Sequence, residues 1–260
     1  MADEFKGEGL PMDYEGVTQV TDQLGVGVPE LWAVLTVETR GCGFLPDRRP
    51  VILFERHIFS KETGRRFDAS DPDISNPNWG GYGQGGAAQY DRLGRAIRLD
   101  RIAALRSSSW GIGQVMGFNA AIAGYADVEE MVKAMAFSES EQLKALSGEV
   151  MHNNLDAALR SHDWAAFARG YNGSEYAKNK YDTRLASAYQ KYLHGPLPDL
   201  TVRAAQIYLL YLGYNPGPVD GVAGRFTYSA LNDFQQANNL PIKNVIDSEI
   251  LAALVAKTIL

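Results

Sequence analysis

The sequence is poor in cysteine and has no hydrophobic run long enough to span a membrane. Cys42 is the single cysteine among 260 residues, which excludes an intramolecular disulfide and a cysteine-based zinc site. A transmembrane helix needs roughly 18 apolar residues in succession, and no stretch approaches that length. The opening segment, Met1 to Lys6, lacks the basic and apolar regions of a secretory signal. We therefore expect synthesis in a reducing cytoplasm and no stable membrane association.

Positive charge is also scarce. The formal net charge is −6, from 25 Lys and Arg residues against 31 Asp and Glu residues. Proteins that bind nucleic acids present a basic face to the phosphate backbone, so no nucleic-acid partner is expected. The same balance excludes simple charge attraction to an anionic surface, and binding to such a surface must come from shaped pockets.

The composition is that of a globular protein with two domains. Hydrophobic residues make up 45% and charged residues 22% of the chain, which is ordinary for a folded soluble domain. Residues 193–200 hold two prolines and a glycine after a helical stretch, which is typical of a linker. We predict a domain over residues 1–193, a linker over 194–200 and a second domain over 201–260.

The first domain is expected to be α+β and mainly helical. Apolar spacing predicts a helix around Val17 to Leu24 and a second one that begins near Pro29. Residues 50–54 predict a short buried strand, and residues 68–86 an irregular loop. Further helices are expected over residues 87–105 and 120–192. Helical spacing after the linker predicts a compact three-helix unit, with helices around residues 202–212, 227–235 and 248–254.

Glu38 is the first candidate for chemistry. It ends the second predicted helix, just before Gly41 and Gly43. The carbonyl end of a helix disfavours a negative charge and so favours a protonated carboxyl group. Glycoside cleavage requires such a group to protonate the leaving oxygen. By itself a glutamate at a helix end is more often a solvated charge.

Two later motifs give Glu38 a context. They are SWGIGQVMG at residues 109–117 and ARGYNG at residues 168–173. In this order the three features resemble the lysozyme-like superfamily of goose-type lysozymes and lytic transglycosylases. The resemblance implies that Glu38 is the general acid and that Gln114 lies in a hairpin lining the sugar cleft. It also implies that Tyr171 and Asn172 support or contact the acid and the substrate.

A narrower resemblance covers roughly residues 10–195. The segment LFERHIF at residues 53–59, combined with SSWGIGQVMG at 108–117, is similar to the phage N-acetylmuramidase endolysins. Members of that family hydrolyse the β-1,4 bond between N-acetylmuramic acid and N-acetylglucosamine. The resemblance implies no metal and no organic cofactor.

The second catalytic group is harder to assign. Glu55 is our tentative candidate, because a glutamate within an apolar strand needs a purpose or a partner. The alternative is a bridge from Glu55 to Arg40 or Arg56. His57 is a tentative substrate-binding residue, although a hydrogen-bonded structural histidine is the more common case. Trp110 is a candidate for stacking on a sugar ring, and packing in the core is its alternative.

The second domain resembles the common peptidoglycan-binding domain over nearly all of residues 201–260. The matching residues are VRAAQ at 202–206, LGY at 212–214, GPVDG at 217–221, Gly224, Thr227, Ala230, Phe234, Gln235, Asn239 and Leu240. Ala223 stands where that family usually has an aromatic residue. Most of these positions set the fold, so the residues that contact the ligand are not identified.

These observations predict a two-domain enzyme that cleaves bacterial peptidoglycan and lyses a phage host. A rear domain would hold it on its insoluble substrate. The resemblance to phage endolysins implies that a protein made without a signal peptide reaches the wall by holin-dependent release. Nothing in the sequence predicts an oligomer. The alternatives are a lytic transglycosylase, which leaves 1,6-anhydro-muramic ends, a non-catalytic wall-binding protein and a related chitin-degrading enzyme.

Overall fold

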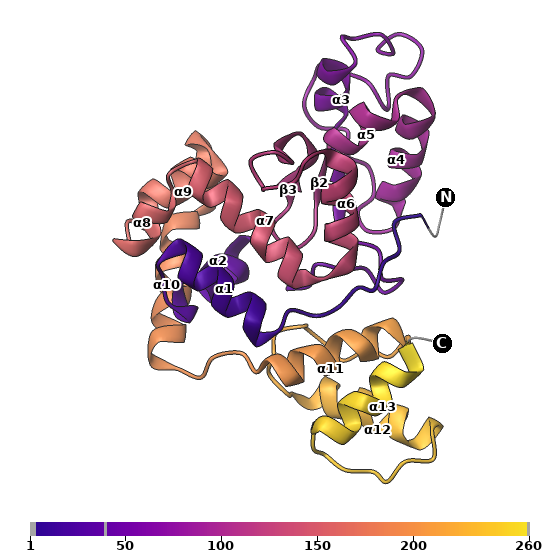
Figure 1. The fold of residues 1–260 in the computed structure, drawn as a ribbon, viewed down its shortest axis with the longest axis vertical. Coiled ribbons are helices and arrows are strands. Elements are labelled where there is room, and N and C mark those ends of the chain that lie inside the picture. The colour runs from indigo at the N-terminus through magenta and orange to yellow at the C-terminus, as the bar shows by residue number, and fades with distance from the viewer. Residues whose placement is uncertain (1–3, 39–40, 259–260) are drawn as a thin grey trace.

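The chain folds as a mainly helical α+β structure with one small sheet, as predicted. The computed structural model describes residues 4–38 and 41–258. Figure 1 shows an elongated molecule made of a larger front unit (residues 4–194, as far as described) and a smaller back unit (residues 200–258) at one end. The front unit buries most of the apolar side chains in one continuous core.

Two helices open the front unit, α1 (Tyr14–Leu24) and α2 (Val28–Glu38). Asp13 caps α1 by accepting a hydrogen bond from the Gly16 amide at 2.8 Å. Gly25, with φ of 67°, ends it in the left-handed conformation. α2 is apolar over most of its surface because it packs against both α1 and α10. Both helices are where the apolar spacing predicted them.

The sheet contains β1 (Ile52–Phe54), β2 (Ser108–Trp110) and β3 (Val115–Met116), all antiparallel. Ser109 lies at its centre, opposite Leu53 on one side and Met116 on the other. The predicted strand at residues 50–54 is confirmed, two residues shorter at its start. The hairpin that the resemblance implied for the Gln114 turn is confirmed as well.

The helix expected over residues 87–105 is in fact two helices, α4 (Ala88–Leu99) and α5 (Arg101–Arg106). Asp100 separates them with an extended backbone. Its carboxylate accepts a hydrogen bond from the Ala103 amide at 3.0 Å and so caps α5. Aspartate is a poor residue inside a helix and a good N-cap, which explains the break. The short α3 (Arg56–Glu62) follows β1, and residues 68–86 form the predicted irregular loop.

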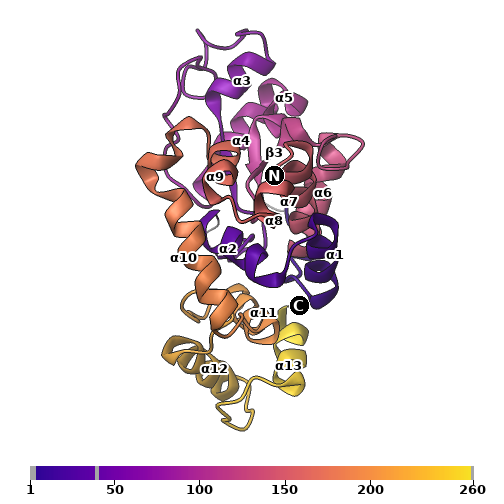
Figure 2. The same ribbon diagram turned by 90° about the vertical axis from the view of Figure 1, so that its left-hand side faces the viewer.

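The rest of the front unit is a set of helices around the sheet and α2. They are η1 (Gly117–Asn119), α6 (Val128–Phe137), α7 (Glu139–His152), α8 (Asp156–Arg160), α9 (Trp164–Asn172), η2 (Ser174–Asn179) and α10 (Tyr181–His194). Figure 2 shows α10 running from the α9 side of the front unit towards the back unit. This long helix therefore carries the chain past α2 to the junction.

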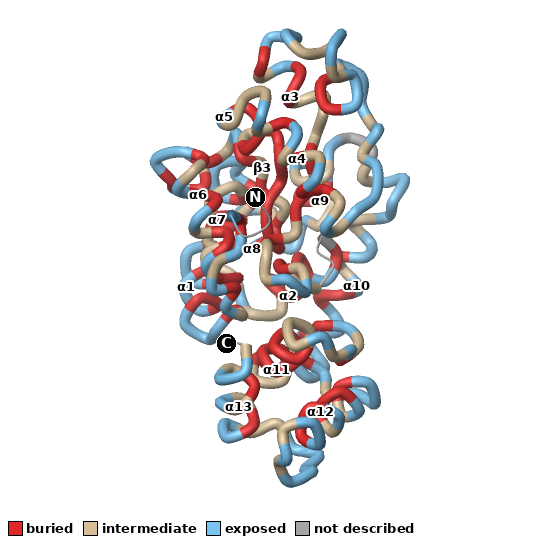
Figure 3. Tube along the Cα trace, turned by 90° about the vertical axis from the view of Figure 1, so that its right-hand side faces the viewer, coloured by how far each residue is buried: buried red, intermediate tan, exposed pale blue. Residues whose placement is uncertain are grey.

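The back unit is the predicted three-helix structure, with α11 (Leu200–Tyr211), α12 (Arg225–Ala237) and α13 (Ser248–Thr258). Gln206 connects its parts: its side-chain oxygen accepts from the amides of Asp220 and Gly221 at 3.1 and 2.9 Å. Its amide nitrogen donates to the Thr227 hydroxyl at 3.1 Å. In Figure 3, α11 is buried over most of its length because it lies between the front unit and the other two helices.

All described helices are too short or too polar to cross a lipid bilayer.

Candidate active site

The predicted acid, Glu38, is the last residue of α2. Its side chain lies outside the described residues, as do the next two residues, 39 and 40. Before it, the Val37 carbonyl accepts a hydrogen bond from Nη2 of Arg184 in α10 at 3.4 Å. After it, Gly41 has a φ of 89°, a conformation that favours glycine. The described part of α2 thus reaches Glu38, and the catalytic role of Glu38 stays a prediction.

Glu55 lies directly after β1, at the N-terminal cap of α3. Its backbone amide donates to the Ser107 carbonyl at 2.9 Å, and its carbonyl accepts from the Phe59 amide at 3.0 Å. The expectation of a glutamate inside an apolar strand is therefore wrong, because the strand ends one residue earlier. The backbone of Glu55 joins the sheet to α3 and so directs its side chain away from the ladder.

The Glu55 carboxylate pairs with a histidine and not with Arg56. Its Oε2 lies 3.1 Å from Nδ1 of His57, and both side chains are largely buried. The other expected partner, Arg40, is outside the described residues. Burial raises the pKa of Glu55, while the charge of His57 and a hydrogen bond from Tyr82 oppose that rise. A carboxyl group in this setting holds its proton more tightly than an exposed one.

An exposed tryptophan adjoins this pair. The rings of His57 and Trp79 lie 4.9 Å apart between centroids, and Trp79 is 77% exposed. Tyr82 comes from the same loop. Burial is the main cause that raises the pKa of Tyr82, and the nearby Glu55 carboxylate adds to the rise. The loop of residues 68–86 thus brings aromatic rings beside the carboxyl group, and an exposed aromatic face is a suitable surface for a sugar ring.

Gln114 shapes the turn between β2 and β3. Its side-chain nitrogen donates to the carbonyls of Val51 and Gly111 at 3.1 and 2.8 Å. Its side-chain oxygen accepts from the Ser109 hydroxyl at 2.9 Å. Gln114 itself has a φ of 50°. These bonds fix the turn and leave its backbone at the edge of a cavity.

The two predicted motifs meet around that cavity, which has a volume of about 410 Å³. Gln114 lines one side, and Tyr171 and Asn172, at the end of α9, line another. The Tyr171 hydroxyl donates to the Gly113 carbonyl at 2.9 Å, which ties the second motif to the turn of the first. Segments 58 residues apart in the chain are thereby joined at one polar opening.

Trp110 does not reach this cavity. Its side chain is 0% exposed in the core of the front unit. The ring packs 5.7 Å from that of Phe5, and its Nε1 donates to the Leu105 carbonyl at 3.1 Å. Trp110 therefore has no surface to offer a substrate. The prediction of a sugar-stacking role is wrong, and its alternative, core packing, is what the structure contains.

Glu149 is a residue of the cavity that the sequence did not reveal. It lies on α7, lines the same opening as Gln114, and accepts a hydrogen bond from the Asn119 side chain at 2.7 Å. Burial raises its pKa, and the Asn119 hydrogen bond opposes the rise. Nothing in the local sequence distinguishes it from any other glutamate in a helix, because its position depends on how α7 packs beside the hairpin.

Other features of the described residues lie apart from this site. A larger cavity of about 670 Å³ lies beside α4, and none of the predicted site residues lines it. Within residues 4–38 and 41–258, no group of three His, Cys, Asp or Glu side chains is arranged to hold a metal ion.

Comparison with known proteins finds similarity to two protein families and to a solved structure. The N-acetylmuramidase family model matches residues 27–193, and a model of a putative peptidoglycan binding domain matches residues 199–254. Among solved structures, the chain is similar to the crystal structure of the Burkholderia AP3 phage endolysin. The identity is 43%, the TM-score is 0.65, and the match covers 69% of each chain. No curated protein matches this chain.

Proposed function

Because the chain belongs to the N-acetylmuramidase family, we propose that Glu38 is the acid that protonates the leaving oxygen of the glycan. The enzyme is a lysozyme-type glycoside hydrolase that cleaves the β-1,4 bond between N-acetylmuramic acid and N-acetylglucosamine in peptidoglycan. The position of Glu38 at the end of the 11-residue helix α2 supports the assignment. The partial negative charge at the C-terminal end of a helix favours the protonated carboxyl group that a general acid requires.

Glu55 is the proposed second carboxyl group. In its ionised form it would take a proton from the attacking water, or attack the sugar itself. The choice depends on its separation from the acid: roughly 6.5–9.5 Å for an inverting enzyme and about 5–5.5 Å for a retaining one. The half-buried pair of Glu55 and His57 supports this role, because the histidine stabilises the carboxylate that the step needs.

The cavity beside the β2–β3 turn is the proposed sugar-binding region. Gln114, Tyr171 and Asn172 would contact the N-acetyl and hydroxyl groups of the glycan there. Much of the bonding capacity of Gln114 is used within the protein, so its main contribution would be to hold the turn in shape. His57 would contact substrate through the Trp79 face, where the two rings adjoin.

The domain division is part of the same proposal. Residues 1–193 form the catalytic domain, residues 194–200 the linker, and residues 201–260 the peptidoglycan-binding domain. The end of α10 at His194 and the start of α11 at Leu200 support these bounds. A domain that binds the wall keeps the catalytic cleft at a high local concentration of glycan strands.

The enzyme acts on the cell wall, and we assign it to phage-induced lysis of the host, as the 43% identity to a phage endolysin suggests. It would be made in the cytoplasm of the infected bacterium and reach the wall through a holin-type lesion. The proposed partner is peptidoglycan, with no nucleic acid, no stable membrane association and a monomeric state.

Mass spectrometry of fragments from purified peptidoglycan tests the proposal. Wild-type enzyme should release fragments with reducing muramic acid ends, and Glu38→Gln should lower the rate at least ~100-fold because a general acid is worth about 10²–10⁴ in rate. Glu15→Gln, an exposed carboxylate in the first turn of α1, is the matched control and should keep full activity.

Two results would contradict parts of this assignment. Anhydro-muramic ends would make the enzyme a transglycosylase and remove Glu55 from the mechanism, because the substrate's own hydroxyl then attacks. Full activity of Glu38→Gln would transfer the role of the acid to another carboxyl group, and Glu149 in the cavity would be the next to substitute.

A further inference from the structure

An arginine of the back unit is buried at the junction with the front unit. Arg203, on α11, is 1% exposed, and its guanidinium forms an ion pair with Glu139 at the start of α7, which is 0% exposed. One of the contacts joins Nη2 of Arg203 to Oε1 of Glu139 at 2.9 Å. Burial acts to lower the pKa of Arg203, but the attraction of Glu139 outweighs it and raises the pKa. The Arg203 side chain is therefore charged, and its guanidinium is held by the Glu139 carboxylate.

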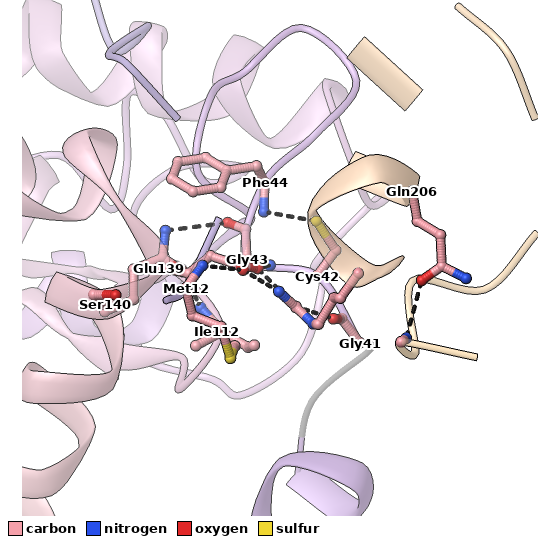
Figure 4. A network of polar contacts seen from close by, with 12 residues as sticks. Met12, Gly41, Cys42, Gly43, Phe44, Ile112, Glu139, Ser140 and Gln206 are labelled. Carbon is pink, nitrogen blue, oxygen red and sulfur yellow. Dashed lines mark hydrogen bonds and ion pairs between the residues drawn. The ribbon is translucent and has the colours of Figure 1, made fainter. Parts of the chain in front are cut away.

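The carboxylate of Glu139 accepts hydrogen bonds from three separate segments of the chain. It accepts hydrogen bonds from the Met12 amide at 3.1 Å and the Gly43 amide at 2.9 Å, in addition to those from Arg203. Figure 4 shows this network, with Gly43 beside Glu139 and with Cys42 and Gly41 further along the same loop. The carboxylate thus ties the N-terminal segment and the loop that follows α2 to a single buried charge, and Arg203 supplies the opposite charge.

Arg203 also holds that loop directly. Its Nη2 donates to the Gly41 carbonyl, three residues beyond Glu38 in the chain. A Cβ added to Gly41 would lie 3.2 Å from the Val219 carbonyl, so the back unit approaches the loop at a second point. Residues from both units, among them Gly41 and Asp220, line a cavity of about 400 Å³ at the junction.

The backbone is therefore fastened on each side of Glu38 by a different arginine. Arg184 of α10 holds the Val37 carbonyl before it, and Arg203 of α11 holds the Gly41 carbonyl after it. The last carbonyls of a helix have no partners within the helix. Donors from other elements, such as these arginines, therefore fix the position of the helix end. A displacement of about 1 Å in a catalytic group can cost ~100-fold in rate.

We propose that Arg203 is a positioning residue for the catalytic acid, so that the back unit completes the active site as well as binding the wall. The proposal rests on the assignment of Glu38 as the acid. Arg203 touches neither the substrate nor the reacting atoms and acts through Gly41 and Glu139. The back unit would then be needed even for cleavage of a soluble glycan, where tethering to the wall brings no advantage.

Steady-state kinetics on soluble, uncross-linked glycan strands test this, with full-length variants. Arg203→Met removes both contacts but leaves the buried charge of Glu139 without an opposite charge beside it. Arg203→Met with Glu139→Gln removes that charge as well, which protects folding, while the Gly41 contact remains lost. We expect kcat of the double variant to fall about tenfold or more with KM nearly unchanged, because a displaced acid weakens the transition state and not substrate binding.

Two further variants sharpen the result. Arg203→Lys keeps the charge but cannot reach Glu139 and Gly41 together, since lysine lacks the planar fork, and its kcat should lie between those of wild type and the double variant. Arg225→Met removes an exposed arginine of the same unit that stacks on Phe226, and its kcat should match wild type. Sedimentation with purified walls should find all of them bound within about twofold of wild type.

Other outcomes separate this proposal from the one on which it rests. If the double variant is less heat-stable than wild type but keeps its kcat within twofold, Arg203 is an interface ion pair without a positioning role. Loss of wall binding at unchanged kcat would overturn the proposal in the same way. Full activity of Glu38→Gln, measured with Arg203 intact, would instead reject the acid assignment.

Discussion

At the scale of single residues, Glu55 is the group whose environment most clearly alters its chemistry. It is 15% exposed in its side chain, adjoins His57 and receives a hydrogen bond from Tyr82. Burial is the dominant influence and raises its pKa above the ordinary value of 4.5. The folded protein therefore binds this proton more tightly than the unfolded chain, and folding stability becomes coupled to pH through this one carboxyl group.

The coupling gives Glu55→Gln a defined pH signature. A raised folded-state pKa contributes stability that is complete below the unfolded pKa of about 4.5 and is lost as pH rises through the folded pKa. Glu55→Gln has no carboxyl group to titrate at this position, so its stability does not fall in this way as the pH rises. Its unfolding free energy relative to wild type should therefore increase from pH 4 to pH 8 in urea titrations. A difference that stays constant over this range would show that the folded protein does not shift the titration of Glu55.

The sequence predicted contacts of single residues where a buried side chain would be unstable without a partner. It did not predict the direction in which a side chain points. A carboxyl group among apolar residues requires a partner, so the sequence correctly indicated that Glu55 is paired. It could not identify His57, because Glu55 lies just after the strand, at the start of α3, where the backbone leaves the sheet. For Trp110 the sequence did not determine whether the ring faces the core or the solvent, because either face of a hairpin can carry an aromatic ring. In the structure the ring is in the core.

At the scale of elements, apolar periodicity predicted α1, α2 and the three helices of the back unit. The break at Asp100 was missed because apolar spacing continues through it, although the N-cap preference of aspartate was visible in the sequence. Contacts between elements were beyond reach. Glu149 joins the cavity because α7 packs beside the β2–β3 hairpin, and no periodic pattern encodes that.

The packing of α7 against the loop after α2 demands a glycine at position 43. A Cβ there would lie 1.8 Å from the side-chain oxygen of Gln142. Gln142 cannot yield freely, because it accepts from the Ile112 amide at 2.7 Å and donates to the Met135 carbonyl at 2.8 Å. Gly43→Ala should lower the unfolding free energy by about 1–3 kcal/mol, as overpacking does. Chemical denaturation measures the change.

A double-mutant cycle identifies the cause of that loss. In a Gln142→Ala background the opposing side chain is gone, and Gly43→Ala should cost distinctly less than it does in wild type. An equal cost in both backgrounds would mean that the glycine is needed for its backbone and not for the space beside Gln142.

At the scale of the whole molecule, the junction is the part that the sequence could not predict. Arg203 belongs to the VRAAQ segment, which the resemblance explains as a determinant of the back unit's own fold. Its neighbour in that segment, Gln206, does have this role. Arg203 instead pairs with a residue 64 positions earlier in the other unit. Contacts between residues so far apart in the chain produce no local sequence pattern. The contact between the two units is therefore visible only in the folded structure.

This union predicts that the two units unfold together. Departure of the back unit would take the counter-charge away from Glu139, and removing one partner of a buried pair costs about 3–5 kcal/mol. Further contacts reinforce the junction: the Tyr211 hydroxyl donates to the Gly9 carbonyl at 2.8 Å, and Arg48 donates to the Thr258 carbonyl at 3.3 Å. Scanning calorimetry of the full chain should give one transition whose calorimetric and van't Hoff enthalpies agree. With Arg203→Met and Glu139→Gln combined, the penalty disappears and the back unit should melt first, as a separate transition. Two transitions in the wild type would mean that the units are merely adjacent.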